Sequence, residues 1–282
     1  MTTSFCDVDF SDGLSGCRVR LSNGVVIKSC DKPYETRLSS QCKKQESFRN
    51  YNFKNIEIPA VLGKDIGSFS MVYAQGMNFS SFLEKANKVD LDFVVETLSA
   101  YFDFFESRSR PSDEIVRTKL VNKLNSMKTL GLSVVQLEKL LDIQTHLDIR
   151  HLPKSMCHGD LTFSNIIFTK NKLWFIDMLD TFIDSYLLDL AKLKQDLFYM
   201  WSSKLRGKKS LRVCQAKRYI WERLCDKKSH LIENEWFDFL DTLNILRIEP
   251  YIKDEHRLVF DEIVKRTPYY ENSYSPDGGK IH

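Results

Sequence analysis

The chain has 282 residues, of which 43% are hydrophobic and 28% are charged, and its formal net charge is +3. This composition is ordinary for a globular protein and is enough for one large domain or two small lobes. The net charge is too small to indicate nucleic acid or a membrane surface as a partner. The seven cysteines include no Cys-x-x-Cys pair, which argues against a zinc site and a disulfide framework.

The N-terminal residues lack the basic and apolar segments of a signal peptide. The longest uncharged stretch, residues 66–83, contains four serines and two glycines, so it is a poor candidate for a membrane span. We therefore expect a soluble cytoplasmic protein with reduced thiols and no membrane contact.

Strand signals surround one helix in the first quarter of the chain. A hairpin is predicted over residues 14–30, because a polar–apolar alternation and a β-branched run flank the turn Ser22-Asn23-Gly24. Two further strands are predicted over residues 56–62 and 68–74. A helix is predicted over residues 37–48, between the hairpin and these two strands. Its inward face has four side chains: Leu38, Gln41, Gln45 and Phe48.

Gly76 punctuates the chain, and the pattern beyond it becomes helical. A hairpin of two apolar runs, residues 166–168 and 173–176, interrupts the helices. The helices are predicted over residues 79–86, 91–105, 116–130, 134–147 and 187–201, with further helix to about residue 265. We predict three parts: an N-terminal lobe (1–76), a helical lobe (77–267) and a flexible tail (268–282).

The strongest chemical signal is the stretch His-Gly-Asp-Leu-Thr-Phe-Ser-Asn at 158–165, followed by Phe-Ile-Asp at 175–177. Asp160, Asn165 and Asp177 can place three oxygen ligands around one phosphate–metal centre. There Asp160 would orient or deprotonate an attacking hydroxyl, while Asn165 and Asp177 would bind Mg²⁺ on a nucleotide. Lys28, at the end of its strand, would hold the α- and β-phosphates. The alternative is a set of unrelated polar residues in turns.

These motifs resemble those of the aminoglycoside phosphotransferase and choline kinase-like family, which has a protein kinase-like fold. The His-Gly-Asp-x-x-x-x-Asn stretch resembles the family's catalytic loop, and Ile176-Asp177 resembles its metal-binding Ile-Asp. The resemblance implies an α+β, two-lobed fold, with a small antiparallel-sheet N-lobe containing one helix and a mostly helical C-lobe. It also implies ATP and Mg²⁺ as cofactors.

Other residues take roles from the resemblance alone. Residues 71–74 resemble the hinge strand, so the backbone at Val72 and Ala74 is expected to hydrogen-bond adenine. Asp189 resembles an Asp that braces the catalytic loop. The family pairs its strand lysine, here Lys28, with a Glu from the following helix. This helix offers three candidates: Glu35, Gln41 and Glu46.

We therefore predict an ATP- and Mg²⁺-dependent phosphotransferase that moves the γ-phosphate to a hydroxyl of a small molecule, such as a sugar or an amino alcohol, with Asp160 as the base. Two alternatives are a non-catalytic pseudokinase or scaffold and an aminoglycoside-modifying kinase. Asp180 and Asp184 belong either to the acceptor pocket or to loop solvation, and the pair Asp184-Ser185 also suits helix capping before Tyr186. The stretch 204–218 has seven basic residues and no acid, but we regard nucleic acid as the less favoured partner and a solvated surface as the better interpretation.

Overall fold

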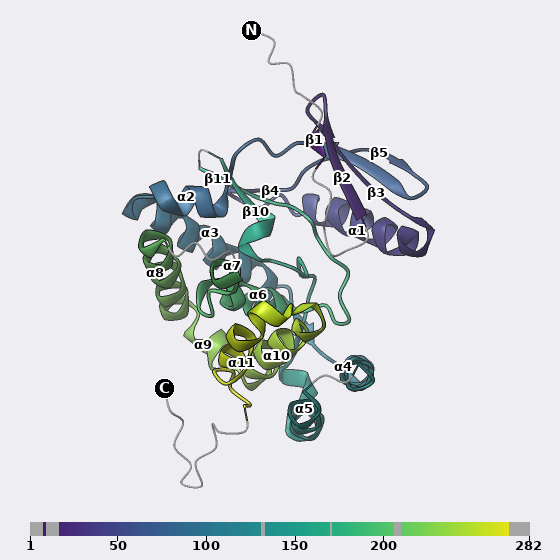
Figure 1. Cartoon of the computed structure of the whole chain (residues 1–282), viewed down its shortest axis with the longest axis vertical. Coiled ribbons are helices and arrows are strands. Elements are labelled where there is room, and N and C mark those ends of the chain that lie inside the picture. Colours follow the sequence, from purple (N-terminus) through teal and green to yellow (C-terminus); the bar gives the residue numbers. More distant parts are fainter. Residues whose placement is uncertain (1–7, 10–16, 131–132, 170, 206–209, 271–282) are drawn as a thin grey trace. The chain divides into compact units, whose positions relative to one another are not determined.

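The computed structural model describes residues 8–9, 17–130, 133–169, 171–205 and 210–270 (Figure 1). The chain divides into two compact units, residues 1–82 with 159–180, and residues 83–158 with 181–282. The first unit thus contains the Asp160–Asp177 stretch together with the N-terminal strands. The lobe boundary at Gly76 stays a prediction, and most of the predicted tail lies outside the described residues.

A five-stranded antiparallel sheet forms the N-terminal part of the first unit. Its spatial order is β1-β2-β3-β6-β5, with β1 (Val8–Asp9), β2 (Cys17–Ser22), β3 (Val25–Cys30), β5 (Val61–Asp65) and β6 (Ser68–Val72). The predicted hairpin is confirmed, because Ser22 pairs with Val25 across a two-residue turn. The turn residues Asn23 and Gly24 have φ values of 51° and 76°, which a two-residue hairpin loop requires.

Helix α1 (Glu35–Arg49) packs across this sheet, as Figure 1 shows. All four side chains predicted to face inward are buried, and Cys42 and Lys44 join them. Leu38 and Cys42 share an apolar core with residues of β2, β3 and β6, namely Cys17, Leu21, Val26, Phe69 and Met71. The helix is therefore held by its apolar positions, which leaves its buried polar side chains for other contacts.

A second sheet contains the hairpin that follows residues 158–165. Its order is β4 (Ile56–Glu57), β11 (Lys172–Phe175), β10 (Ile166–Thr169) and β7 (Met77–Asn78). The prediction of one strand over residues 56–62 was wrong, because residues 56–57 pair with β11 and residues 61–65 pair with β6. Pro59 lies between them, and since proline has no N–H to donate to a ladder, the chain changes sheets there.

Helices make up most of the second unit, with one two-stranded ribbon of β8 (Arg110–Pro111) and β9 (Pro153–Lys154). No helix in the described ranges is long and apolar enough to cross a membrane. The helix predicted over residues 187–201 is broken, because α6 ends at Leu197 and Met200 adopts a left-handed φ of 59°. The helices are α3 (Lys88–Glu106), α4 (Glu114–Lys128), α5 (Val134–His146), α6 (Tyr186–Leu197), α7 (Trp201–Leu205), α8 (Leu211–Lys227), α9 (Ser229–Ile232), α10 (Glu235–Leu246) and α11 (Arg257–Val264), and α2 (Phe79–Lys85) links the two units.

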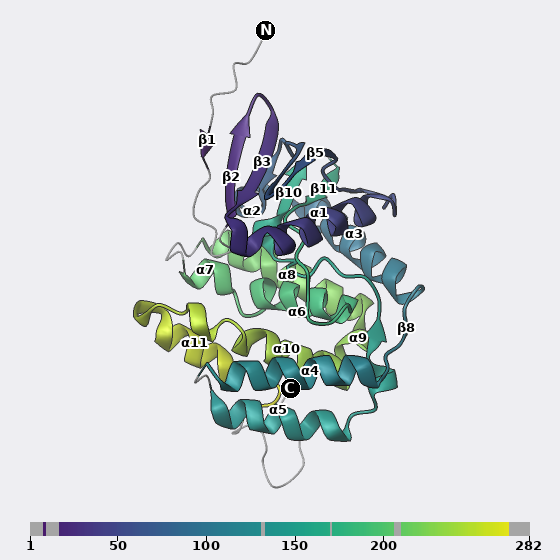
Figure 2. The ribbon, with the colours of Figure 1, turned by 90° about the vertical axis from the view of Figure 1, so that its right-hand side faces the viewer.

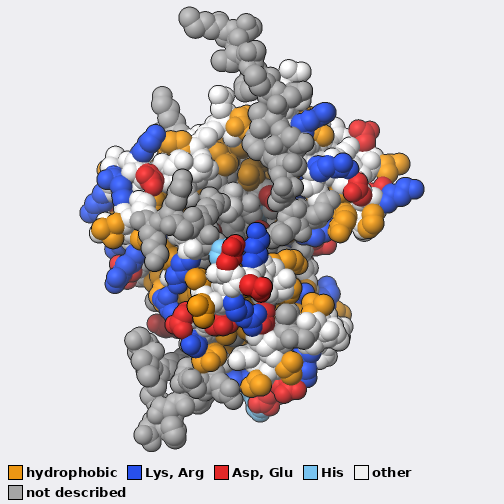
Figure 3. Space-filling model, viewed as in Figure 1, with side chains coloured by type: hydrophobic (Ala, Val, Ile, Leu, Met, Phe, Trp, Pro, Cys, Tyr) orange, Lys and Arg blue, Asp and Glu red, His pale blue; other side chains and the backbone are white. Residues whose placement is uncertain are grey.

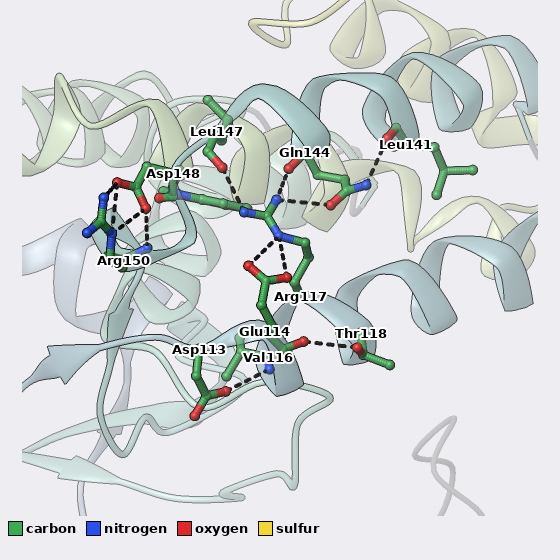
Figure 4. Close-up of polar contacts among 11 residues, drawn as sticks. Asp113, Glu114, Val116, Arg117, Thr118, Leu141, Gln144, Leu147, Asp148 and Arg150 are labelled. Atoms are coloured by element: carbon green, nitrogen blue, oxygen red, sulfur yellow. Dashed lines mark hydrogen bonds and ion pairs between the residues drawn. The ribbon is translucent and has the colours of Figure 1, made fainter.

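Arg117 joins α4 to the C-terminal end of α5, two helices that run side by side in Figure 2. Its guanidinium donates to the backbone oxygen of Gln144 and, at 2.9 Å, to that of Leu147, while its Nε lies 3.0 Å from the carboxylate of Glu114 (Figure 4). The last carbonyls of a helix have no intrahelical partner, and a cation near them complements the helix dipole. Arg117 therefore caps α5 and ties it to α4.

Replacing Arg117 with Met should lower the free energy of unfolding by about 1–3 kcal/mol, because two helix-end carbonyls lose a charged donor. Urea denaturation followed by circular dichroism measures the change. Arg223→Met is a matched control, since that guanidinium is 49% exposed and lies 3.5 Å from Asp226 on the surface of α8. Such a pair contributes about 0–1 kcal/mol. Equal stability of the two variants would contradict the capping role.

Candidate functional site

A pocket of about 470 Å³ lies within the first unit, a size typical of small-ligand sites. Strands β2, β3, β6 and β10 supply apolar walls, which include Val19, Val26, Met71 and Ile167, and Ile176 adds to them directly after β11. Polar side chains also line it: Lys28, Gln41, Gln45, Asn78, Asn165 and Asp177. The pocket thus combines an apolar surface with several of the predicted site residues.

Lys28 is the buried cation of this pocket, with 4% of its surface exposed. Its Nζ donates to Oε1 of Gln41 at 2.8 Å and forms an ion pair with the carboxylate of Asp177. A buried ammonium is tolerated only when it is paired and hydrogen-bonded. Glu46, the charged candidate for this role, instead pairs with Lys64 at 2.5 Å. Gln41 is therefore the α1 partner of Lys28.

Asp160 and Asn165 are joined across the short turn between them. Nδ2 of Asn165 donates to the backbone oxygen of Asp160 at 2.8 Å and to its carboxylate at 3.0 Å, and Thr162 N–H donates to the same backbone oxygen at 2.7 Å. Within the described residues nothing donates to Oδ1 of Asn165, so this oxygen can act as a metal ligand. The backbone oxygen of Asn165 accepts the Ile176 N–H at 3.0 Å, one residue before Asp177.

The segment that contains Asp177 is held by α1. Asp177 has a φ of 59°, a left-handed conformation that is uncommon outside glycine. Two residues further on, the backbone oxygen of Leu179 accepts a hydrogen bond from Nζ of the buried Lys44 at 2.7 Å. Lys44 was not among the residues predicted for the site, although its position three residues after Gln41 places it on the same helix face.

The backbone N–H groups of the predicted hinge differ in whether another described residue accepts from them. Val72 N–H donates to the backbone oxygen of Ala60 at 3.0 Å, and Tyr73 N–H donates to that of Gly24 at 3.3 Å. The Ala74 N–H makes no hydrogen bond within the described part of the chain, and Ala74 lines the pocket. An adenine ring in this pocket could therefore bind the N–H of Ala74, whereas Val72 could offer only its carbonyl.

Gly76 lies against the hairpin that follows the catalytic-loop motif. A Cβ atom at this position would be 2.4 Å from the backbone oxygen of Phe168, a distance that only glycine avoids. Aromatic pairs hold the same segments together, with ring centroids 3.9 Å apart for Phe79 and Phe163 and 3.8 Å apart for Phe82 and Phe168. These contacts keep the loop and hairpin within the first unit.

In the second unit, Asp189 of α6 braces the backbone at His158. Its buried Oδ2 accepts the His158 N–H at 2.6 Å and the Tyr101 hydroxyl at 2.6 Å. Burial and the charge of Asp189 raise the pKa of Tyr101 well above its ordinary value, so the hydroxyl remains a donor. Asp189 therefore fixes the chain two residues before Asp160, which is the supporting role expected from the sequence.

Asp184 makes contacts within its own unit. Its carboxylate accepts from the Thr181 hydroxyl at 3.2 Å, and its backbone oxygen accepts the Ser155 N–H at 3.0 Å. Ser185, not Asp184, caps α6, with its hydroxyl accepting from Leu187 N–H. Helix capping, predicted for the pair Asp184-Ser185, is therefore confirmed, and Ser185 is the member of the pair that provides it.

Most basic side chains that the structure describes in the stretch 204–218 make contacts within the second unit. Arg212 donates to the Ala86 carbonyl at 2.9 Å, Lys217 is buried against two serine hydroxyls, and Arg218 pairs with Glu222 at 2.7 Å. Residues 206–209 lie outside the described residues. On the second unit, as drawn in Figure 3, basic and acidic side chains are interspersed. These contacts favour the interpretation of a solvated helix flank.

No protein-family model matches the sequence, and no curated protein does. Solved structures match nearly the whole chain. A thermostable mutant of the aminoglycoside phosphotransferase APH(4)-Ia has a TM-score of 0.61 at 13% identity, covering 94% of this chain and 96% of that one. The streptomycin–ATP complex of APH(2")-IIa has a TM-score of 0.59 at 14% identity, with 93% and 92% covered. Choline kinase LicA from Streptococcus pneumoniae has a TM-score of 0.57 at 14% identity, with 94% of each chain covered.

These matches show that the chain has the protein kinase-like fold that aminoglycoside phosphotransferases share with choline kinase. The predicted α+β class, with an antiparallel sheet and one helix near the N-terminus and helices beyond, is confirmed. At 13–14% identity the likeness concerns the fold, so the chemistry has to be argued from the site itself.

Replacing Lys44 with Met should loosen residues 177–180, because the Leu179 carbonyl loses its donor. We expect amide hydrogens of this segment to exchange about tenfold faster, as measured by hydrogen–deuterium exchange mass spectrometry. Lys43→Met is the matched control, since Lys43 is the exposed neighbour on α1. Unchanged protection of residues 177–180 in the Lys44 variant would contradict the anchoring role.

Proposed function

We propose that the chain is an ATP- and Mg²⁺-dependent phosphotransferase that moves the γ-phosphate of ATP to a hydroxyl group of a small molecule. The observation that best supports this proposal is the arrangement of side chains in the first unit. One pocket is lined by Lys28, Gln41, Asn165 and Asp177, and Asp160 is hydrogen-bonded to Asn165. Proteins of the same fold include aminoglycoside phosphotransferases and choline kinase, which supports this class of reaction.

The pocket suits a nucleotide in both its polar and its apolar parts. The apolar walls would enclose the adenine ring, the Ala74 N–H would bind its edge, and Lys28 would bind the α- and β-phosphates as a point charge. Complexes of APH(2") enzymes with ATP and with ADP have this fold, which supports a nucleotide as the ligand.

The oxygen donors of the site fit Mg²⁺ in the way a nucleotide-bound ion requires. Among the described residues, no group of three or more His, Cys, Asp and Glu side chains could hold a metal by itself. Mg²⁺ is usually held by one or two protein oxygens together with substrate phosphates. Asn165 and Asp177 would supply those oxygens, and the bound ion would neutralise charge on the transferring phosphate.

Asp160 is the residue proposed to act on the acceptor hydroxyl. The hydroxyl proton passes to the Asp160 carboxylate, the acceptor oxygen forms a bond to the γ-phosphorus, and the bond from that phosphorus to the β–γ bridging oxygen breaks to leave ADP. The hydrogen bond from Asn165 holds the carboxylate in place. A pseudokinase usually lacks one of these groups, whereas Lys28, Asp160, Asn165 and Asp177 are all present.

The acceptor is proposed to be a sugar, an amino alcohol or a related metabolite, with an aminoglycoside as the alternative. Solved structures of this fold include enzymes for both choline and aminoglycosides. A screen of ATP consumption across sugars, amino alcohols and aminoglycosides, with product masses checked for one added phosphate, distinguishes these classes. Failure of every hydroxyl compound to be phosphorylated would favour the non-catalytic alternative.

Asp160→Asn should lower kcat by about 10²- to 10⁴-fold while ATP binding is retained, because the amide cannot accept the hydroxyl proton. Turnover is measured with the acceptor found in the screen, and binding is measured by thermal shift. Asp65→Asn, an exposed carboxylate on β5, is the matched control and should retain full activity. Undiminished turnover in the Asp160 variant would exclude it as the base.

Removal of Mg²⁺ with EDTA should abolish turnover, and added Mg²⁺ should restore it. Asp177→Asn should raise the Mg²⁺ concentration for half-maximal rate about tenfold or more, because the metal loses its carboxylate ligand. A titration of initial rate against Mg²⁺ checks this. An identical Mg²⁺ dependence in the variant and the parent chain would rule out Asp177 as a ligand.

A further inference from the structure

We propose that Gln41 is itself a phosphate-binding residue, whose side-chain N–H donates to the nucleotide phosphate that Lys28 contacts. This inference rests on the proposed nucleotide site and deepens it. It assigns to Gln41 a contact that a glutamate, the residue that the family pairs with this lysine, could not make.

The orientation of the Gln41 amide follows from its partner. The ammonium of Lys28 has donors only, so the atom of Gln41 that lies 2.8 Å from Nζ must be the acceptor oxygen Oε1. The amide nitrogen is therefore the atom of this side chain that Lys28 leaves unbonded. Gln41 is 2% exposed and lines the pocket, and its Nε2 has no hydrogen-bond partner within the described residues.

An unpaired buried amide of this kind is rare in folded proteins and calls for an explanation. Gln45, one turn later on the same helix, shows the ordinary situation. It is 3% exposed and also lines the pocket, but its Nε2 donates to the Pro59 carbonyl at 2.8 Å. Both glutamines lie on the same helix, are similarly buried and line the same pocket, yet only Nε2 of Gln41, the glutamine bonded to Lys28, lacks a partner among the described residues.

The surroundings of this donor define the chemistry of its ligand. The ligand atom must be an acceptor, and since Gln41 is hydrogen-bonded to Lys28 it must also be compatible with an ammonium group close by. An anionic phosphate oxygen meets both conditions. Because Gln41 is neutral, Asp177 is the one carboxylate among the described residues that pairs with Lys28, so little negative charge from these side chains opposes an incoming phosphate.

The test compares Gln41→Glu with the parent chain in binding to ATP, ADP and adenosine by isothermal titration calorimetry with Mg²⁺ present. If the amide donates to phosphate, the carboxylate of the variant repels it, and ATP and ADP should bind about tenfold or more weakly. Adenosine, which has no phosphate, should bind as before. Gln215→Glu, an exposed change of the same charge on α8, should leave all three affinities unaltered.

The result that would contradict a phosphate contact of Gln41 can also be stated. If Gln41 serves only to hold Lys28, the glutamate should hold it better, and unchanged or tighter ATP binding in Gln41→Glu would overturn the inference. That result would leave the proposed function standing, whereas absence of ATP binding in the parent chain would overturn both.

A neutral pair of variants covers the case in which Gln41→Glu does not fold. Gln41→Met is made alone and in a Lys28→Met background, and ADP affinity is compared across the cycle. A direct contact predicts a further several-fold loss of affinity from the second substitution. No further loss in the Lys28→Met background would show that Gln41 acts only through Lys28, and the inference would be wrong.

Discussion

The geometry of the site depends on one buried ammonium group. Lys28 lies in the middle of the sheet at 4% exposure, where an unpaired charge would be strongly destabilising. Its two partners come from distant positions in the sequence, Gln41 on α1 and Asp177 after β11. Satisfying this single charge therefore brings α1 and the segment that contains Asp177 to the same strand. An apolar contact is non-directional and would not select these two partners.

Helix α1 positions several groups of the site at once, because it carries the partner of Lys28 together with two other buried polar side chains. Its apolar side chains pack against the sheet, and the buried Lys44 and Gln45 lie three and four residues after the buried Gln41. Gln41 contacts Lys28, Lys44 binds the Leu179 carbonyl, and Gln45 binds the Pro59 carbonyl. A shift of the helix by one residue would break all three contacts, so the helix sets the register of the site.

Secondary-structure elements that are specified by residues close in the sequence could be predicted well. The hairpin at residues 17–30 follows from its turn residues, and the inward face of α1 follows from helical spacing. The motif from Asp160 to Asp177 could be recognised because its residues are close in sequence. The strand over residues 56–62 was predicted wrongly because hydrophobicity continues through Pro59, whereas the hydrogen-bond ladder does not. Lys44 was missed because its role depends on a carbonyl 135 residues away.

The sequence alone therefore determined the local elements and the chemical groups of the site, since turns, helical spacing and motif residues act over a few positions. Only the tertiary structure decided how those groups pair. It selected Gln41 over Glu46 as the partner of Lys28, because Glu46 is turned toward Lys64. Among the described residues, it also left the Ala74 N–H without a hydrogen bond while pairing that of Val72 with Ala60, because long-range strand pairing decides which backbone donors are used.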